Sequence, residues 1–224
     1  MSKIRIHKTE KYIKVNNIYC VGRNYVDHIN EMNGSIFSEL PVIFIKPNSS
    51  IINDGGVVEI PKYSDNYISE NLHYEVELVI VISRNGQNIP ENETEKYILG
   101  YAVGLDMTLR DIQDDSKKNG TPWAISKGFL SSAPVSDIIL KNPSLNPMKF
   151  ELILFQNNIK KQHANTSLMI HNIYKLISYI SSIFSIQKHD LIFTGTPVGV
   201  GKAISGDKIV AKLDKKLKLS VKVL

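Results

Sequence analysis

Two glutamates in alternate positions, Glu75 and Glu77, stand at the start of an apolar, β-branched run. On a strand, alternate side chains share a face, so both carboxylates should point the same way. A run that is apolar on both faces is normally buried in a sheet. Two buried carboxylates on one face repel each other and lose hydration unless a cation or a paired base lies between them.

A third carboxylate, Asp106, ends the next apolar stretch, residues 101–105. If the two strands are neighbours, three oxygen donors converge, and such donors suit Mg²⁺, Mn²⁺ or Ca²⁺. The sequence has no cluster of Cys or His that would favour zinc. The alternative is that Glu75 and Glu77 face water on an edge strand, and the pattern alone leaves both interpretations open.

His28 and Glu31 stand three apart in a predicted helical segment, residues 24–32, so they share a face. A carboxylate beside an imidazole fixes its tautomer and raises its basicity, and such a pair can activate a water molecule. The alternative is a solvated helix face.

Three further side chains follow the third carboxylate. Arg110 and Gln113 have helical spacing, and Arg110 could bind a substrate carboxylate through two nitrogens. It could instead pair with a neighbouring aspartate on a solvated turn. These aspartates are Asp111, Asp114 and Asp115. Lys127 lies among apolar residues, so it either extends its ammonium to solvent or is functional.

Residues 194–201 read Thr-Gly-Thr-Pro-Val-Gly-Val-Gly. A phosphate-binding P-loop requires G-x-x-x-x-G-K-[ST], but Ala203 follows Gly201-Lys202 and Thr196 stands where the first Gly should be. The segment is therefore not a P-loop. Its glycines still permit close approach of a ligand, and Thr196 offers a hydroxyl and an amide to an anion.

Strands dominate the pattern that must position these residues. They are predicted at residues 18–21, 41–45, 57–60, 74–83, 97–105, 190–194, 207–212 and 217–223. A one-sided apolar spacing predicts a helix over residues 167–187. The alternation of Lys and Leu in residues 212–218 predicts an edge strand with one solvated face. The fold class is therefore α+β, without an evident domain boundary.

The chain has 224 residues and a formal net charge of +5, and its composition is typical of a globular protein. The lysines are mostly scattered and no basic stretch is interleaved with aromatics, so we expect no nucleic-acid partner. The single cysteine, Cys20, lies in an apolar run and is interpreted as a core residue. No signal-peptide core or bilayer-spanning run is present, so we expect a cytoplasmic protein without a membrane partner.

Together these segments resemble the fumarylacetoacetate hydrolase family, in particular its single-domain branch of acylpyruvases and oxaloacetate decarboxylases. The matching stretches are Val-Gly-Arg-Asn-Tyr (21–25) with His28 and Glu31, Phe-Ile-Lys-Pro (44–47), Leu-His-Tyr-Glu-Val-Glu-Leu (72–78), Leu-Asp-Met-Thr (105–108) with Arg110 and Gln113, Pro-Trp (122–123), Lys-Gly-Phe (127–129) and residues 194–201. They run in family order, so the resemblance covers almost the whole chain.

The resemblance implies a mixed β-roll with a few helices, one catalytic domain over residues 1–224 and a homodimer. It implies one Mg²⁺ or Mn²⁺ per chain, held by Glu75, Glu77 and Asp106. Within a strand and lid segment, residues 17–34, it makes His28 and Glu31 the dyad that activates water. It places Lys127 beside the metal. The substrate-anion contacts that it implies are Arg23, Arg110, Gln113 and Thr196.

The implied substrates are small 2-keto or 2,4-diketo carboxylic acids. An enolate stabilised at the metal would serve C–C hydrolysis of acylpyruvates, decarboxylation of oxaloacetate or keto–enol tautomerisation. The alternative is an isomerase of the 2-hydroxyhepta-2,4-diene-1,7-dioate type, from aromatic catabolism, on the same metal frame.

Overall fold

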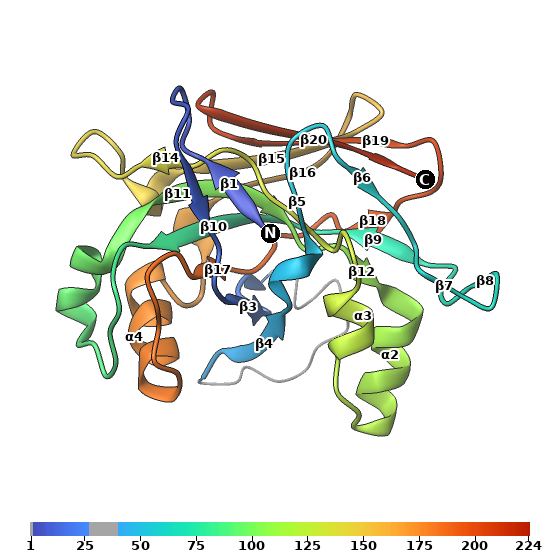
Figure 1. The fold of residues 1–224 in the computed structure, drawn as a ribbon, viewed down its shortest axis with the longest axis horizontal. Coiled ribbons are helices and arrows are strands. Elements are labelled where there is room, and N and C mark those ends of the chain that lie inside the picture. The colour runs from blue at the N-terminus through green and yellow to red at the C-terminus, as the bar shows by residue number, and fades with distance from the viewer. Residues whose placement is uncertain (1, 27–39) are drawn as a thin grey trace.

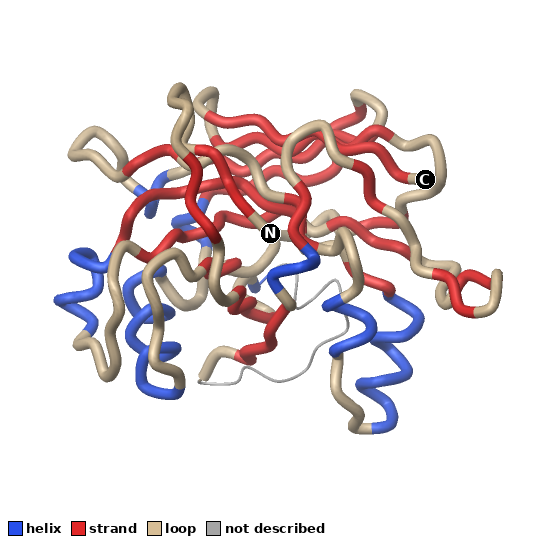
Figure 2. Tube along the Cα trace, in the orientation of Figure 1, coloured by secondary structure: helices blue, strands red, loops and turns tan. Residues whose placement is uncertain are grey.

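The computed structural model describes residues 2–26 and 40–224, in which two large β-sheets are flanked by helices (Figures 1 and 2). The α-helices of these residues are α2 (Arg110–Asn119), α3 (Ala124–Gly128) and α4 (Ile173–Ile183). Short 3-10 helices lie at η1 (Asn48–Ser50), η2 (Glu91–Tyr97), η3 (Pro147–Lys149) and η4 (Thr166–Leu168).

The first large sheet has six strands. In spatial order they are β14 (Ile139–Leu140), β11 (Ile98–Leu105), β10 (Val76–Ile82), β17 (Leu191–Phe193), β3 (Ile18–Gly22) and β4 (Val42–Lys46). β10 runs antiparallel to both of its neighbours, whereas β17 and β3 are parallel.

The second large sheet has five strands and lies above the first in Figure 1. In spatial order they are β16 (Ile159–Asn165), β15 (Glu151–Gln156), β19 (Lys208–Leu213), β20 (Leu217–Val223) and β6 (Val57–Val58). Smaller sheets pair β12 (Thr108–Leu109) and β18 (Gly201–Lys202) with β9 (Leu72–Tyr74), β1 (Lys3–Arg5) with β2 (Tyr12–Lys14), β13 (Ala133–Pro134) with β5 (Ile51–Ile52), and β7 (Lys62–Tyr63) with β8 (Asn66–Tyr67).

The alternating side chains of β10 enter two different hydrophobic clusters. Leu78, Ile80 and Ile82 belong to the main core, together with apolar residues of the five-stranded sheet and of α4. Val79 and Val81 belong to a second cluster that also takes residues from β1, β2 and β3. β10 is therefore buried on both faces, as its unbroken apolar run requires.

The strand directions gather several loops at one edge of the six-stranded sheet. Because β11 and β17 run antiparallel to β10, both end beside its start, and β3 ends there too because it is parallel to β17. Gly104 of β11 pairs with Glu77 at this edge. A Cβ on Gly104 would lie 2.5 Å from the Phe193 ring and 2.7 Å from Val79, so close packing requires a glycine there.

The α+β class predicted from sequence is confirmed, and each central strand lies where the apolar runs predict it. The helix predicted over residues 167–187 is shorter. α4 begins at Ile173 because the Asn172 side chain accepts hydrogen bonds from the amides of Tyr174 and Lys175 and caps it. Within the described residues, no helix is long and apolar enough to cross a membrane.

The edge strand predicted for residues 212–218 is wrong. β19 is paired with β15 and β20, and β20 also pairs with β6, while the residues between β19 and β20 form the turn of a hairpin. Alternation of Lys and Leu reports one buried face and one solvated face. It does not report whether the edges of the strand are hydrogen-bonded.

Candidate metal centre

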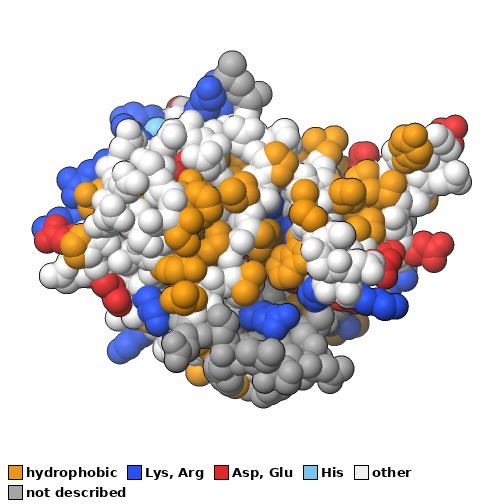
Figure 3. Space-filling view, turned by 90° about the horizontal axis from the view of Figure 1, so that it is seen from below, with side chains coloured by type: hydrophobic (Ala, Val, Ile, Leu, Met, Phe, Trp, Pro, Cys, Tyr) orange, Lys and Arg blue, Asp and Glu red, His pale blue; other side chains and the backbone are white. Residues whose placement is uncertain are grey.

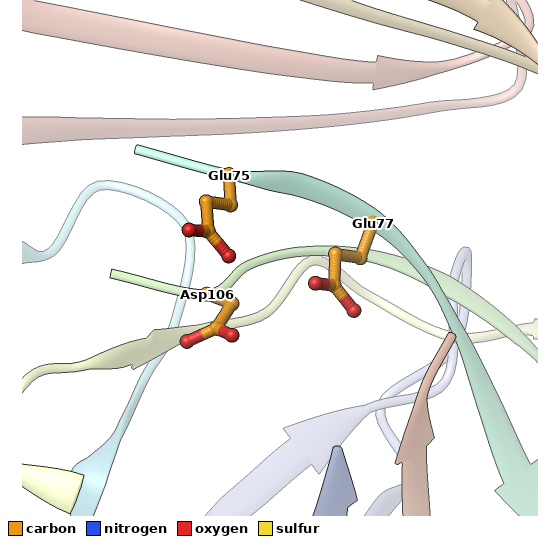
Figure 4. A group of neighbouring side chains, drawn as sticks. All are labelled: Glu75, Glu77 and Asp106. Carbon is orange, nitrogen blue, oxygen red and sulfur yellow. The ribbon is translucent and has the colours of Figure 1, made fainter. Parts of the chain in front are cut away.

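Glu75, Glu77 and Asp106 each offer a carboxylate oxygen, and these oxygens lie within 4.8 Å of one another (Figure 4). Glu75 precedes β10, Glu77 lies within it, and Asp106 directly follows β11. The amide of Asp106 donates to the carbonyl of Glu75 over 2.8 Å, which sets the two side by side. The three residues are only 5, 1 and 1 % exposed, so the interpretation as a solvated edge strand is wrong.

Glu77 carries the electrostatic strain of the cluster. Burial raises its pKa well above the usual value, and the charges of Asp106 and Glu75 raise it further. The amide of Gly195 donates to Glu77 Oε2 over 2.7 Å and partly offsets this effect. Gly195 has a φ of +94° and lies against Asn24, so this donor depends on a glycine. Among the described residues, Glu77 forms no ion pair.

The side chains present fit a hard divalent cation. All three donors are carboxylates, the ligands that Mg²⁺ and Mn²⁺ prefer. In the described part of the chain, Asp106 Oδ1 is buried without a hydrogen bond, although Lys46 Nζ lies 2.8 Å away. The Lys46 contact is an ion pair that does not meet hydrogen-bond geometry, so a divalent cation at this oxygen would lower the cost of its burial further.

Lys127 lies against the cluster, and its ammonium bridges two of the carboxylates. Nζ donates to Glu75 Oε2 over 2.9 Å, to Asp106 Oδ2 over 2.7 Å and to Thr108 Oγ1 over 2.6 Å. Burial favours the neutral amine, but the charges of Asp106 and Glu75 outweigh it and raise the pKa of Lys127. The alternative of an ammonium extended to solvent is therefore wrong.

Arg110 and Gln113 are brought together with Glu75. Arg110 begins α2 and donates through Nη2 to Glu75 Oε1 and through Nη1 to Gln113 Oε1. The predicted alternative, an ion pair between Arg110 and an aspartate on a solvated turn, is wrong because Arg110 and Gln113 are buried. Asp111 instead accepts from the hydroxyl of Ser69 over 2.5 Å, which ties the start of α2 to the segment before β9.

His73 supports Arg110 as a neutral imidazole. Burial and, to a lesser extent, the charge of Arg110 together lower the pKa of His73 to about 4. Arg110 Nε donates to His73 Nδ1 over 3.4 Å, and His73 Nε2 lies 3.1 Å from Asn71 Oδ1. These contacts agree with a ring that accepts at Nδ1 and donates at Nε2.

Thr196 lies beside the start of β10, but its hydroxyl proton is already engaged. Oγ1 donates to the carbonyl of Val76 over 2.9 Å and accepts from Gln162 Nε2 over 2.9 Å. Gln162 also accepts from the amide of Val76 over 2.9 Å and donates to the carbonyl of Pro197 over 2.8 Å. Of the two donors predicted for Thr196, only the amide is left for an anion.

Asn24 and Arg23 follow β3 at the same edge. Asn24 Nδ2 donates to the carbonyls of Thr194 and His171, over 2.8 and 3.0 Å, so it fixes the loop that contains Gly195. Arg23 has a φ of +61° and is exposed. Its predicted contact with a substrate anion stays a prediction.

His28 and Glu31 lie outside the described residues, so the water-activating dyad also stays a prediction. Conversely, Lys46, Gln162, Asn24 and Thr108 support the site without having been predicted to do so. Lys46, Asn24 and Thr108 belong to stretches that resemble the family. Gln162 gives no such signal, because a buried glutamine on a strand reads like a solvated one.

We expect Gln162→Leu to destabilise the protein by about 2–4 kcal/mol, because it removes hydrogen bonds and leaves the Val76 amide and the Pro197 carbonyl buried without partners. Urea unfolding monitored by circular dichroism measures this change. The control is Gln87→Leu at an exposed position, which we expect to have little effect. Equal stability of the two variants would contradict the bridging role of Gln162.

Comparison with known proteins agrees with this geometry. The family model for the C-terminal domain of fumarylacetoacetate (FAA) hydrolase matches residues 17–224. The chain is 44 % identical to the mitochondrial oxaloacetate tautomerase FAHD1 of Rattus norvegicus, over 92 % of this chain and 91 % of the relative.

Two solved structures extend the comparison. The fumarylpyruvate hydrolase of Pseudomonas aeruginosa, in complex with Mn²⁺ and pyruvate, matches with a TM-score of 0.91 and 34 % identity, over 99 % of this chain and 95 % of that one. The 2-hydroxyhepta-2,4-diene-1,7-dioate isomerase of Mycobacterium marinum matches with a TM-score of 0.81 and 32 % identity, over 94 % and 75 % of the two chains. The chain belongs to the fumarylacetoacetate hydrolase family.

Proposed function

We propose that this chain is a divalent-metal-dependent enzyme that enolises small 2-keto acids. Keto–enol tautomerisation of oxaloacetate is the activity that we favour. The observation that carries the proposal is the buried cluster of Glu75, Glu77 and Asp106 beside Arg110 and Lys127. The name of the rat relative, oxaloacetate tautomerase, supports this choice of reaction. Decarboxylation of oxaloacetate is a further outcome of the same enolate stabilisation.

Mg²⁺ or Mn²⁺, one per chain and held by the three carboxylates, would polarise the keto oxygen of the substrate. The side chains of the protein supply the rest. Arg110 and Gln113 bind and orient the substrate carboxylate. The Lys127 ammonium, fixed by Glu75 and Asp106, stabilises the negative charge that develops on the substrate oxygen.

The balance of charges supports a substrate with two negative charges. Three buried cations face the three carboxylates: Lys46, Lys127 and Arg110. A divalent ion would therefore add two positive charges to a site that is otherwise balanced among the described residues. A dicarboxylate such as oxaloacetate neutralises this excess, whereas a keto monocarboxylate does so only as its enolate.

C–C hydrolysis of acylpyruvates is the second candidate. Its support is the similarity to the P. aeruginosa fumarylpyruvate hydrolase, which was solved with pyruvate. The hydrolysis needs a general base that activates a water molecule, and we assign this role to His28, oriented by Glu31. The double-bond isomerase remains the alternative, supported by the similarity to the M. marinum enzyme.

A homodimer is part of the proposal. Exposed apolar side chains lie on β4 and around α3, at Val42, Ile45, Ile125 and Leu130. Figure 3 shows hydrophobic side chains gathered on the face seen from below. We expect sedimentation equilibrium to give twice the mass of one chain, because paired copies would cover such a surface. A single-chain mass at micromolar concentration would contradict the dimer.

The other predicted properties stay predictions. They are the cytoplasmic location, the absence of nucleic-acid and membrane partners, and a single domain over residues 1–224. The rat relative carries the word mitochondrial in its name, so the location of this protein has to be measured by cell fractionation.

We expect Glu77→Gln to weaken Mn²⁺ binding by more than the roughly 10–100-fold that loss of an outer-shell partner typically costs, because it removes a direct ligand. Tautomerisation of oxaloacetate should fall with it, and a chelator should abolish turnover of the wild type. Electron paramagnetic resonance of free Mn²⁺ measures the affinity.

The control for this experiment is Glu59→Gln, which removes the same charge at an exposed position. Full turnover in the presence of chelator, or wild-type Mn²⁺ affinity of Glu77→Gln, would contradict the proposed metal site.

We expect His28→Ala to lower hydrolysis of acetylpyruvate by about 10²-fold or more, the effect of a lost general base. Spectrophotometric assays with acetylpyruvate, oxaloacetate and a dienedioate measure the three reactions separately. His163→Ala, at an exposed histidine paired with Glu151, is the control. Unchanged hydrolysis would remove His28 from the mechanism, and turnover of the dienedioate alone would favour the isomerase.

A further inference from the structure

A second lysine, Lys46, is buried against Asp106 of the acidic cluster. Lys46 ends β4, and its side chain is 0 % exposed. Its Nζ lies 2.8 Å from Asp106 Oδ1 and donates to the carbonyl of Met107 over 3.3 Å and to the carbonyl of Lys127. Among the described residues, all three contacts of this ammonium thus lie on the two segments that carry Asp106 and Lys127.

The burial of Lys46 limits what it can do. A charged ammonium is kept out of water only when paired and hydrogen-bonded, and here the Asp106 carboxylate and two carbonyls fulfil that condition. Because the ammonium is engaged by these three partners and the side chain is fully buried, we assign Lys46 no contact with a substrate. Its effect must pass through the residues that it touches.

The two lysines hold opposite oxygens of one carboxylate. Lys127 Nζ donates to Asp106 Oδ2, and Lys46 Nζ lies against Asp106 Oδ1. Rotation of the carboxylate would therefore break contacts with both ammonium groups. The bond from Lys46 to the carbonyl of Lys127 also holds the end of α3, the helix that carries Lys127.

We propose that Lys46 is a positioning residue, which fixes the Asp106 carboxylate and the end of α3 so that Asp106 and Lys127 face the divalent ion and the substrate. The inference rests on the proposed metal site. A buried ion pair contributes little net stability compared with apolar residues of similar volume, so stability alone does not explain a lysine here. Partners that orient metal ligands, by contrast, affect metal affinity directly.

The test compares Lys46→Met and Lys46→Gln with the wild type, by electron paramagnetic resonance titration with Mn²⁺. Both variants remove the charge, while Lys46→Gln keeps a donor for the two carbonyls and serves if Lys46→Met does not fold. We expect both to weaken Mn²⁺ binding by about 10–100-fold, the effect of losing an outer-shell partner. The rise in Tm that Mn²⁺ produces should shrink accordingly.

Ser132→Ala is the matched control. The Ser132 hydroxyl is buried and donates to the same Lys127 carbonyl over 2.9 Å, but no contact with Asp106 is recorded among the described residues. This variant loosens the end of α3 alone, so we expect a lower Tm with Mn²⁺ affinity near that of the wild type.

The outcomes separate the inference from the proposed function. If the Lys46 variants have a lower Tm but bind Mn²⁺ as the wild type does, Lys46 is structural and the inference is overturned. The same holds if Ser132→Ala weakens Mn²⁺ binding as much as they do. If the wild type itself binds no Mn²⁺, the proposed metal site fails, and the inference fails with it.

Discussion

Three carboxylates whose oxygens lie within 4.8 Å of one another, almost fully out of water, impose the constraint on which the rest of this site depends. Like charges at such a distance raise one another's proton affinity, and burial adds to the effect, as the raised pKa of Glu77 indicates. Buried cations compensate part of this charge: Lys127 and Arg110 contact Glu75, and Lys46 and Lys127 contact Asp106. A divalent ion would complete the compensation at Glu77.

The sheet makes such crowding possible. The start of β10 lies beside the ends of β11 and β17, so residues from distant parts of the chain meet there without long loops. Glycines admit the close approaches, Gly104 against the Phe193 ring and Gly195 against Asn24. Gln162 then hydrogen-bonds β16 to β10 and to the loop of Thr196. The three carboxylates are thus placed by main-chain hydrogen bonds and buried amide side chains, which hold a geometry more firmly than exposed side chains do.

Relatives with three different reactions in their names match this chain over most of its length. In tautomerisation, C–C hydrolysis and double-bond migration alike, negative charge develops beside a carbonyl. A metal ion, a lysine and an arginine can together stabilise that charge. The reactions differ in where a proton or a water molecule is delivered. Under the proposed function, that difference would lie with His28 and Glu31 more than with the carboxylate cluster.

The sequence by itself determined the central strands and the α+β class, and it marked three carboxylates as candidate ligands, because burial on both faces of a strand and alternation of its side chains are local properties. It left open whether Glu75 faced water and whether Arg110 paired with an aspartate, since both depend on which segments become neighbours. Only the tertiary structure decided that Arg110 contacts Glu75 and that Lys46, far from Asp106 in the chain, lies against it. An apolar pattern reports how much of a side chain is buried, whereas the partner of a buried charge is set by the register and order of the strands.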